Sequence, residues 1–302
     1  MRTRAPGKVV ISGAYAVLGG APAIVSAVDR YVLCDATRPA AWTTPEVRIA
    51  LGATVAPYFD ATALRQGDRK LGLGSSAAIL VASLAARLTE GELDAPHGRS
   101  RLATAAVAAH RVAQGGGSGI DVLASTFGGT LEVRLSGQTP SARSVRLPEG
   151  LAIELWASGT AASTAEMLRA VDRLGQSEPA RYARLMEAQS LAASDAADAV
   201  ERNGSEPFLS SLCRQHAALE ALGDGAGVPI VTRGVADLHR EAREQSACFL
   251  PSGAGGGDIS LFVGTEASSR AFRALAADLG HVLVPARVGA QGVHVWHAGE
   301  DE

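Results

Sequence analysis

Residues 72–78 read Gly-Leu-Gly-Ser-Ser-Ala-Ala and run directly into an apolar, alanine-rich segment at residues 79–88. The pattern predicts a glycine turn followed by a buried helix, because the segment is apolar on nearly all of its faces. A helix that starts here leaves backbone N–H groups unpaired at its positive end. The two glycines would let the main chain approach an anion, and the two serines would offer hydroxyls to phosphate oxygens or a magnesium ion. The alternative is an ordinary loop with a serine N-cap.

A second glycine-rich stretch, Pro251-Ser-Gly-Ala-Gly-Gly-Gly-Asp258, precedes an apolar segment that predicts a strand at residues 259–263. Four glycines in five residues cost chain entropy unless a ligand or another backbone approaches closely. We therefore expect this loop to contact a ligand, and a tight turn between domains is the alternative.

The third signal is Gly117-Ser-Gly-Ile-Asp121-Val, which comes before a predicted helix at residues 122–127. An aspartate placed there can simply cap the helix. It can also orient or deprotonate a hydroxyl nucleophile and help to bind magnesium. Taken alone, the segment favours the cap.

The composition is that of a globular protein large enough for two packed domains: 302 residues, of which 47% are apolar and 20% charged. With a net charge of −3 and scattered arginines, the chain is not expected to bind nucleic acid, so local geometry must hold any anionic ligand. Cys34, Cys213 and Cys248 lack metal-ligand spacing, which predicts buried thiols and neither a disulfide nor a zinc site. No signal-peptide run and no apolar stretch of about 18 residues is present, which predicts a cytoplasmic protein without membrane contact.

Hydrophobic patterning predicts strands and helices along the whole chain. In the first half we expect strands at 8–12, 23–28, 31–36, 47–51, 130–135, 144–147 and 151–156, and helices at 79–88, 100–112 and 122–127, with Ser100 as the N-cap of the second helix. In the second half we expect helices at 163–175, 179–202, 207–222, 234–246 and 266–279, and strands at 259–263, 281–287 and 292–296. A change of character near residue 157 predicts two domains, residues 1–156 and 157–302.

Together these segments resemble a known family. Ala5-Pro-Gly-Lys8 with Gly13-x-Tyr15-Ala-Val, followed by the two glycine-rich stretches, is similar to the three ordered motifs of the galactokinase, homoserine, mevalonate and phosphomevalonate (GHMP) kinase superfamily. The order and separations match over nearly the whole chain. His110 with the Asp121 segment, and the stretch 156–167, resemble the phosphomevalonate kinase branch most.

The resemblance implies an α+β fold in two domains. The first would be a nucleotide-binding domain like ribosomal protein S5 domain 2, with a left-handed crossover, and the second would be ferredoxin-like, with the active site between them. The implied activity is an ATP- and magnesium-dependent small-molecule kinase of the mevalonate pathway of isoprenoid biosynthesis. Its first expected acceptor is 5-phosphomevalonate, and mevalonate or another small alcohol is the alternative. A catalytically silent nucleotide-binding relative is a third alternative, and a decarboxylase relative is a fourth, although such enzymes differ in the region of residues 110–121. A homodimer is left open.

The same resemblance implies roles for individual residues. Lys8 and Asp121 are the expected catalytic pair, with Lys8 between the acceptor oxygen and the γ-phosphate and Asp121 orienting Lys8 or acting as base. The ATP phosphates are expected on Gly72, Leu73, Gly74, Ser75, Ser76 and Ala77. The expected substrate-binding residues are Tyr15, His110, Ser118, Gly119, Ser163, Thr164, Ser252, Gly253, Ala254 and Gly255. Magnesium is expected on Ser76 and Asp121.

Several positions depart from the family pattern. Ala14 stands where the family usually has glutamate, and Thr160 and Leu250 stand where phosphomevalonate kinases often have lysine. Two missing cations would weaken recognition of a phosphorylated acceptor, because each charge-assisted hydrogen bond to phosphate contributes about 1.5–3 kcal/mol. Mevalonate kinases tend to carry a magnesium-binding glutamate where this chain has His110, which could also be a polar residue capping its own helix. The acceptor therefore stays open.

Overall fold

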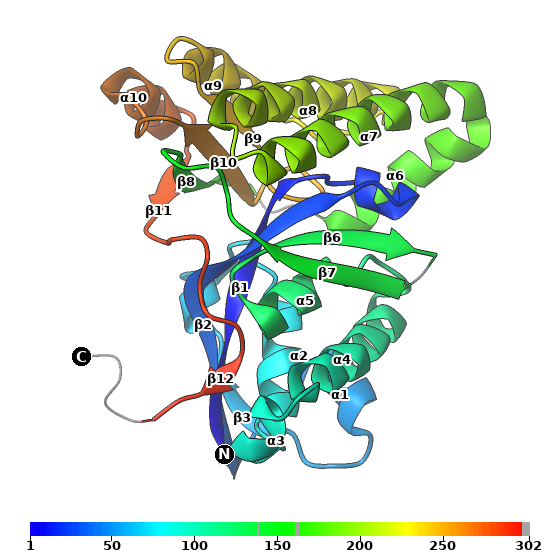
Figure 1. Ribbon diagram of the computed structural model, residues 1–302, viewed down its shortest axis with the longest axis vertical. Coiled ribbons are helices and arrows are strands. Elements are labelled where there is room, and N and C mark those ends of the chain that lie inside the picture. The colour runs from blue at the N-terminus through cyan, green and yellow to red at the C-terminus, as the bar shows by residue number, and fades with distance from the viewer. Residues whose placement is uncertain (138, 161–162, 298–302) are drawn as a thin grey trace. The chain divides into compact units, whose positions relative to one another are not determined.

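The computed structural model describes residues 1–137, 139–160 and 163–297 (Figure 1). Its contacts divide the chain into two units made of separate segments. The first unit contains Met1–Val9, Val25–Leu131 and Val288–Glu302, and the second contains Val10–Ile24 and Glu132–Arg287. The two domains expected from the sequence, residues 1–156 and 157–302, stay a prediction. Each unit is described separately below.

The first unit combines a sheet with a group of helices (Figure 1). Its strands are β1 (Arg2–Ser12), β2 (Ala23–Pro39), β3 (Pro57–Asp60) and β12 (His294–Val295), and β1 and β2 continue across the division. Its α-helices are α1 (Pro45–Leu51), α2 (Ser75–Ala85), α3 (Glu90–Asp94), α4 (Gly98–Gln114) and α5 (Ile120–Phe127). It also holds the 3-10 turn η2 (Thr62–Leu64) and the short antiparallel pair β4 (Arg65–Gln66) and β5 (Arg69–Lys70). β12 pairs antiparallel with β1, and β3 pairs antiparallel with β2.

Helix α2 follows the first glycine-rich stretch, as the sequence predicts, although it starts at Ser75 and not at residue 79. Residues 77–83 are all buried, in keeping with their apolar composition. The Thr3 hydroxyl of β1 donates a hydrogen bond to the Ala82 carbonyl at 2.9 Å, which ties α2 to the sheet. Helix α2 is therefore held against the sheet by both packing and hydrogen bonding.

Three local predictions for this unit are wrong. Residues 47–51 lie in helix α1 and not in a strand, because Thr44 caps the helix through the Val47 N–H and a proline occupies the first turn. Strand β2 runs without interruption through residues 29–30, where the sequence suggested a break. Helix α4 starts at Gly98 with His97 as its N-cap (φ 66°), in place of Ser100.

The second unit is built on an antiparallel sheet in the order β11 (Val282–Val284), β8 (Ala152–Ala157), β10 (Ile259–Gly264) and β9 (Cys248–Pro251). Its α-helices are α6 (Thr164–Ser177), α7 (Pro179–Glu201), α8 (Ser205–Ala226), α9 (Arg233–Arg243) and α10 (Arg270–Asp278). It also holds the 3-10 turn η1 (Ala16–Gly19), and β6 (Thr130–Ser136) enters it to pair with β7 (Thr139–Val145). Strand β9 was not predicted. The mixture of helices and sheets confirms the predicted α+β class. In the described part of the chain, no helix combines the length and apolarity that crossing a bilayer requires.

The second unit contains two stacked histidines, of which His216 is buried and His239 is half-buried. The rings of His216 (α8) and His239 (α9) lie 3.7 Å apart between centroids. Their Nδ1 atoms lie 2.8 Å and 2.9 Å from the carbonyl oxygen of Phe249, so each ring can donate a proton to it. Burial lowers the pKa of His216 from 6.5 to about 3, with a further contribution from His239, and burial also lowers the pKa of His239. Both rings are therefore neutral at pH 7.

This pair predicts an acid-sensitive fold. Below pH 6.5 the unfolded chain binds protons that the folded chain excludes, so stability is full above this pH and falls on acidification towards pH 3. Each excluded proton contributes a slope of up to about 1.4 kcal/mol per pH unit. His216→Asn keeps an N–H donor near the Phe249 carbonyl but cannot titrate. Urea unfolding at pH 7.5, 6.0 and 5.0 should show a shallower pH dependence in His216→Asn than in wild type, and equal slopes would contradict the assignment.

Candidate functional site

Three residues that the sequence analysis grouped lie together in the first unit. Lys8, on β1, is 7% exposed, and its Nζ lies 3.4 Å from Oδ1 of Asp121, whose side chain is 31% exposed. Gly74 lies against both, because a Cβ there would be 3.0 Å from Lys8 Cε and 3.5 Å from Asp121 Oδ2. The buried Lys8 ammonium and the partly exposed Asp121 carboxylate therefore both lie next to the glycine turn at Gly74.

The turn is fixed to β1 through the backbone. The Lys8 N–H donates to the carbonyl of Leu73 at 2.9 Å, and the Leu73 side chain is buried. A Cβ at Gly7 would lie 2.9 Å from the same carbonyl oxygen and 2.8 Å from Leu64 Cδ2, so the motif before Lys8 needs glycine for this close approach. The sequence Pro6-Gly7-Lys8 therefore places the lysine beside the turn.

Two helices start near this pair without a side-chain cap. Gly74 (φ 75°) is the N-cap of α2, and Gly119 (φ 76°) is the N-cap of α5. No side chain of the described residues caps either helix, so the serine-cap alternative for residues 75 and 76 is wrong, as is the cap interpretation of Asp121, which lies in the first turn of α5. First-turn N–H groups and the positive ends of two helix dipoles favour an anion.

The loop before α5 is held by Arg111 of helix α4. Its Nε donates to the Gly117 carbonyl at 2.9 Å, and its Nη2 lies 3.4 Å from the Ser118 carbonyl. Ser118 and Gly119 thereby lead into the turn that carries Asp121. Arg111 is a positioning residue that the sequence analysis did not assign to the site.

His110 faces a buried acid on α1 that sequence reasoning missed. Glu46 is 2% exposed, and its Oε1 accepts a hydrogen bond from Gln114 Nε2 at 2.5 Å. Burial would raise the pKa of Glu46, but hydrogen bonds from its own N–H, Thr44 and Gln114, with the charge of His110, lower it. His110 does not cap α4, whose C-cap is Gly115. Among the described residues, Glu46 Oε2 and His110 Nδ1 are buried without hydrogen-bond partners.

In the second unit, the second glycine-rich stretch is anchored by the motif around Tyr15. The Tyr15 hydroxyl donates to the Ala254 carbonyl at 2.6 Å, and the Val10 N–H donates to Ser252 Oγ at 2.8 Å. Burial raises the pKa of Tyr15, so its hydroxyl keeps the proton that it donates. Three of the expected substrate-binding residues therefore make contacts within the protein that hold the loop: Tyr15, Ser252 and Ala254.

The glycines of this loop are explained mostly by the chain itself. A Cβ at Gly255 would lie 2.2 Å from the Ile230 carbonyl oxygen, and one at Gly257 would lie 2.7 Å from the Thr160 carbonyl oxygen. At Gly256 it would lie 3.0 Å from Met167 Cε. Gly253 differs, because no described atom lies within 4 Å of the added Cβ. Close approach of other backbone segments therefore explains Gly255 and Gly257 without a ligand, whereas Gly256 meets only the end of a flexible side chain.

The remaining predicted residues of this unit lie at the start of α6. Ser163 caps the helix by accepting the Glu166 N–H at 3.3 Å, and Thr164 is the first, exposed residue of the helix. Residues 161 and 162, which the same motif includes, lie outside the described residues. Leu250 is buried in β9 opposite Leu261, so this position forms part of the core.

Comparison with known proteins finds relatives of this chain in sequence and in structure. Residues 47–129 match the GHMP kinases N terminal domain. The chain is 28% identical to the phosphomevalonate kinase of Streptomyces sp. strain CL190, covering 88% of this chain and 90% of that one. It is also 28% identical to the mevalonate kinase of Archaeoglobus fulgidus, covering 88% and 94%. Phosphomevalonate kinase of Streptococcus pneumoniae, solved with phosphomevalonate and AMPPNP, has the same fold, with a TM-score of 0.73, 17% identity and coverage of 95% and 99%.

The family match begins in α1 and ends just after α5, so it includes the glycine turn at Gly74 and the Asp121 segment. The two curated relatives and the solved structure extend the similarity over most of the chain. The resemblance inferred from the three motifs is confirmed: residues 47–129 match the GHMP kinase family model, and the chain is similar over most of its length to curated phosphomevalonate and mevalonate kinases.

Proposed function

We propose that this chain is an ATP-dependent kinase that phosphorylates 5-phosphomevalonate to mevalonate 5-diphosphate. The observation that carries the proposal is the Lys8–Asp121 pair beside Gly74, at the uncapped start of α2. The similarity to a phosphomevalonate kinase over most of both chains supports the choice of acceptor. We further propose that the enzyme acts in the cytoplasm.

The residues around Gly74 fit the phosphates of a nucleoside triphosphate. Gly74 leaves space that any side chain would fill against Lys8 and Asp121, and the first-turn N–H groups of α2 carry no side-chain cap. These N–H groups, with the Ser75 and Ser76 hydroxyls, would hold the phosphates. Ser76 and the Asp121 carboxylate offer the oxygen ligands that magnesium prefers, and the bound ion would neutralise charge on the phosphates.

The catalytic pair would act mainly by position and charge. The Lys8 ammonium would lie between the acceptor oxygen and the γ-phosphate, and Asp121 would fix its orientation through the 3.4 Å contact. Phosphoryl transfer needs in-line placement and charge neutralisation more than covalent help. An acceptor phosphate has a second pKa of about 6 and is largely ionised at neutral pH, so it requires no strong base. The ion-paired state of Asp121 suits such an acceptor.

The remaining substrate contacts are proposed for both units. In the first unit they are His110, Ser118 and Gly119, and in the second they are Ser163, Thr164, Ser252, Gly253 and Gly255. Gly253 is the strongest of these, because its glycine is not required by packing against the described residues. Tyr15 and Ala254 would act by holding the loop.

A hydroxyl acceptor, mevalonate or another small alcohol, is the second candidate. Thr160 and Leu250 give no cation at the two positions where phosphomevalonate kinases often carry lysine, and Leu250 is buried in β9. The mevalonate kinase of Archaeoglobus fulgidus matches at the same identity. A hydroxyl would need Asp121 to accept its proton.

A coupled assay of ADP release against 5-phosphomevalonate, mevalonate and a panel of other small alcohols separates the candidates. We expect turnover with 5-phosphomevalonate and at least ten times lower kcat/KM with mevalonate, a difference of about 1.4 kcal/mol in transition-state binding. Turnover with mevalonate alone would support the hydroxyl acceptor instead. Binding of an ATP analogue without turnover on any acceptor would indicate a silent relative.

A further inference from the structure

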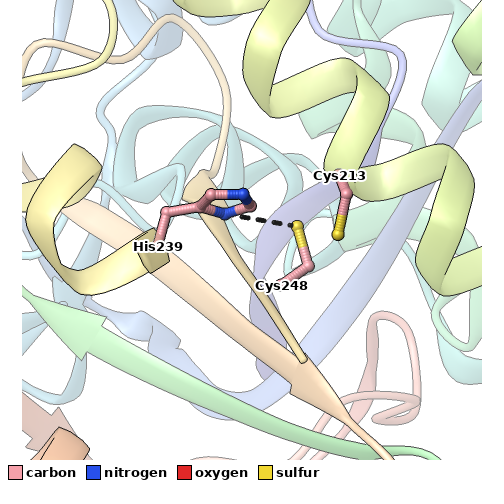
Figure 2. Close-up of side chains that lie close together, drawn as sticks. All are labelled: Cys213, His239 and Cys248. Carbon is pink, nitrogen blue, oxygen red and sulfur yellow. Dashed lines mark hydrogen bonds between the residues drawn. The ribbon is translucent and has the colours of Figure 1, made fainter. Parts of the chain in front are cut away.

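Two cysteines and a histidine that are distant in sequence meet in the second unit. Cys213 lies on α8, His239 on α9 and Cys248 at the first residue of β9. The two cysteine Sγ atoms and a ring nitrogen of the histidine all lie within 4.8 Å of one another. Figure 2 shows the two sulfurs facing each other. The sequence predicted buried thiols; Cys34 and Cys248 are buried free thiols, whereas Cys213 is a half-buried free thiol that the fold brings next to Cys248. Cys34, in the first unit, has no part in the cluster.

The two thiols differ in their surroundings. Cys213 is half-buried, and Arg243 Nη1 lies 3.1 Å from its sulfur. A hydrogen bond from Cys248 lowers the pKa of Cys213 to about 7, with help from Arg243 and against the effect of burial. Burial raises the pKa of Cys248. Near neutral pH, Cys213 therefore has a large thiolate fraction beside a protonated thiol.

The contacts favour thiol chemistry over a metal site. His239 Nδ1, the histidine nitrogen at 3.8 Å from Cys248 Sγ, is already 2.9 Å from the Phe249 carbonyl oxygen. The guanidinium of Arg243 occupies the side of Cys213 and would repel a dication. The cluster among the described residues offers three ligand atoms, whereas structural zinc sites use four. A partly exposed thiol with a lowered pKa beside a second thiol is the arrangement of a redox-reactive pair.

We propose that Cys213 and Cys248 are a reversible oxidation site, in which peroxide converts the two thiols into a disulfide. The Cys213 thiolate attacks one oxygen of hydrogen peroxide, the O–O bond breaks, and hydroxide leaves to form water with a proton. The resulting sulfenic acid is attacked by the Cys248 sulfur, which loses its proton as the second water leaves. Two thiols and one peroxide thus give one disulfide and two waters. The bond would link α8 to β9, four residues before Ser252.

Differential alkylation followed by mass spectrometry tests this site without an activity assay. After brief treatment with hydrogen peroxide, we expect the Cys213–Cys248 peptide pair to lose the mass of two hydrogen atoms and to regain it with dithiothreitol. Cys34 is the internal control, because burial raises its pKa to about 12 and it should stay a thiol. Cys248→Ser should stop at a Cys213 sulfenic acid that dimedone traps, and Cys213→Ser should prevent both products.

Arg243→Gln removes the charge beside Cys213 and should slow the oxidation several-fold at pH 7 while leaving both cysteines in place. Oxidation of Cys34 at the same rate as Cys213, or a Cys213 sulfinic acid formed without any disulfide, would overturn the proposal. Metal analysis of the untreated protein tests the alternative that the cluster binds zinc. One equivalent of zinc that is lost in Cys213→Ser would assign the cluster to a metal instead.

Discussion

Lys8→Met is expected to lower kcat by at least about 100-fold, and Asp121→Asn by a similar factor. The reason is geometric: the ammonium and the carboxylate lie 3.4 Å apart beside the turn at Gly74, where the proposed phosphoryl transfer takes place. Steady-state kinetics with the accepted substrate measures both effects. Because the two side chains act through one contact, the double variant should lose little more than the worse single variant.

A folding control is needed for these variants. Asp121→Asn leaves the buried Lys8 ammonium without its carboxylate, which costs stability, whereas Lys8→Met removes the buried charge. Thermal unfolding of both variants separates lost stability from lost catalysis. Asp94→Asn is the matched control, since Asp94 forms a solvent-exposed ion pair with Arg99 at 3.0 Å and should keep the wild-type rate. Near-normal kcat in both Lys8→Met and Asp121→Asn would mean that the roles are misassigned.

The choice of lysine at position 8 is itself informative. Lys8 is one of two lysines in a chain whose other cationic side chains are arginines. Its stem runs past Gly74, where even a methyl group would lie 3.0–3.1 Å from Lys8 carbons. A compact ammonium on a thin stem fits this space better than a planar guanidinium. Lys8→Arg should therefore keep the positive charge but still have a kcat well below that of the wild type.

The glycine turn before α2 was predictable because its signals are local. The signal is a glycine directly followed by an apolar run, and both lie in consecutive residues. In the structure, Gly74 has φ 75° and directly precedes α2. The start of α1 was equally local, since Thr44, Pro45 and Glu46 form a helix-start signal. It was missed because the short apolar run at 47–51 fits a strand as well as a helix.

Other features depend on residues that only the fold brings together. Glu46 contacts Gln114, and the charge of His110 helps to lower the pKa of Glu46, although both partners lie more than 60 positions further along the chain. Cys213 and Cys248 meet because α8 and β9 pack together. No pattern within a window of sequence specifies such pairs. For the second glycine-rich stretch, sequence reasoning stated two causes, ligand or backbone, and only the structure could show that backbone accounts for Gly255 and Gly257.

Gly255→Ala should be the most destabilising single change in that loop. Gly255 has φ 76°, a conformation that costs an alanine roughly 1–2 kcal/mol. Its Cβ would also lie 2.2 Å from the Ile230 carbonyl oxygen, which accepts the Gly256 N–H at 2.9 Å. Ile230 belongs to a buried cluster with Met167, so the carbonyl cannot move freely. We expect a loss of at least about 3 kcal/mol of unfolding free energy, measured by urea unfolding.

Gly253→Ala separates backbone strain from steric overlap in the same loop. Gly253 also has positive φ, at 100°, but open space surrounds its added Cβ among the described atoms. It should therefore lose only the strain contribution, about 1–2 kcal/mol. If packing explains Gly255 and ligand approach explains Gly253, then Gly255→Ala lowers stability most, while Gly253→Ala raises the KM of a well-folded enzyme. Equal destabilisation of the two variants would show that the Ile230 carbonyl yields, and the glycine at 255 would then need another explanation.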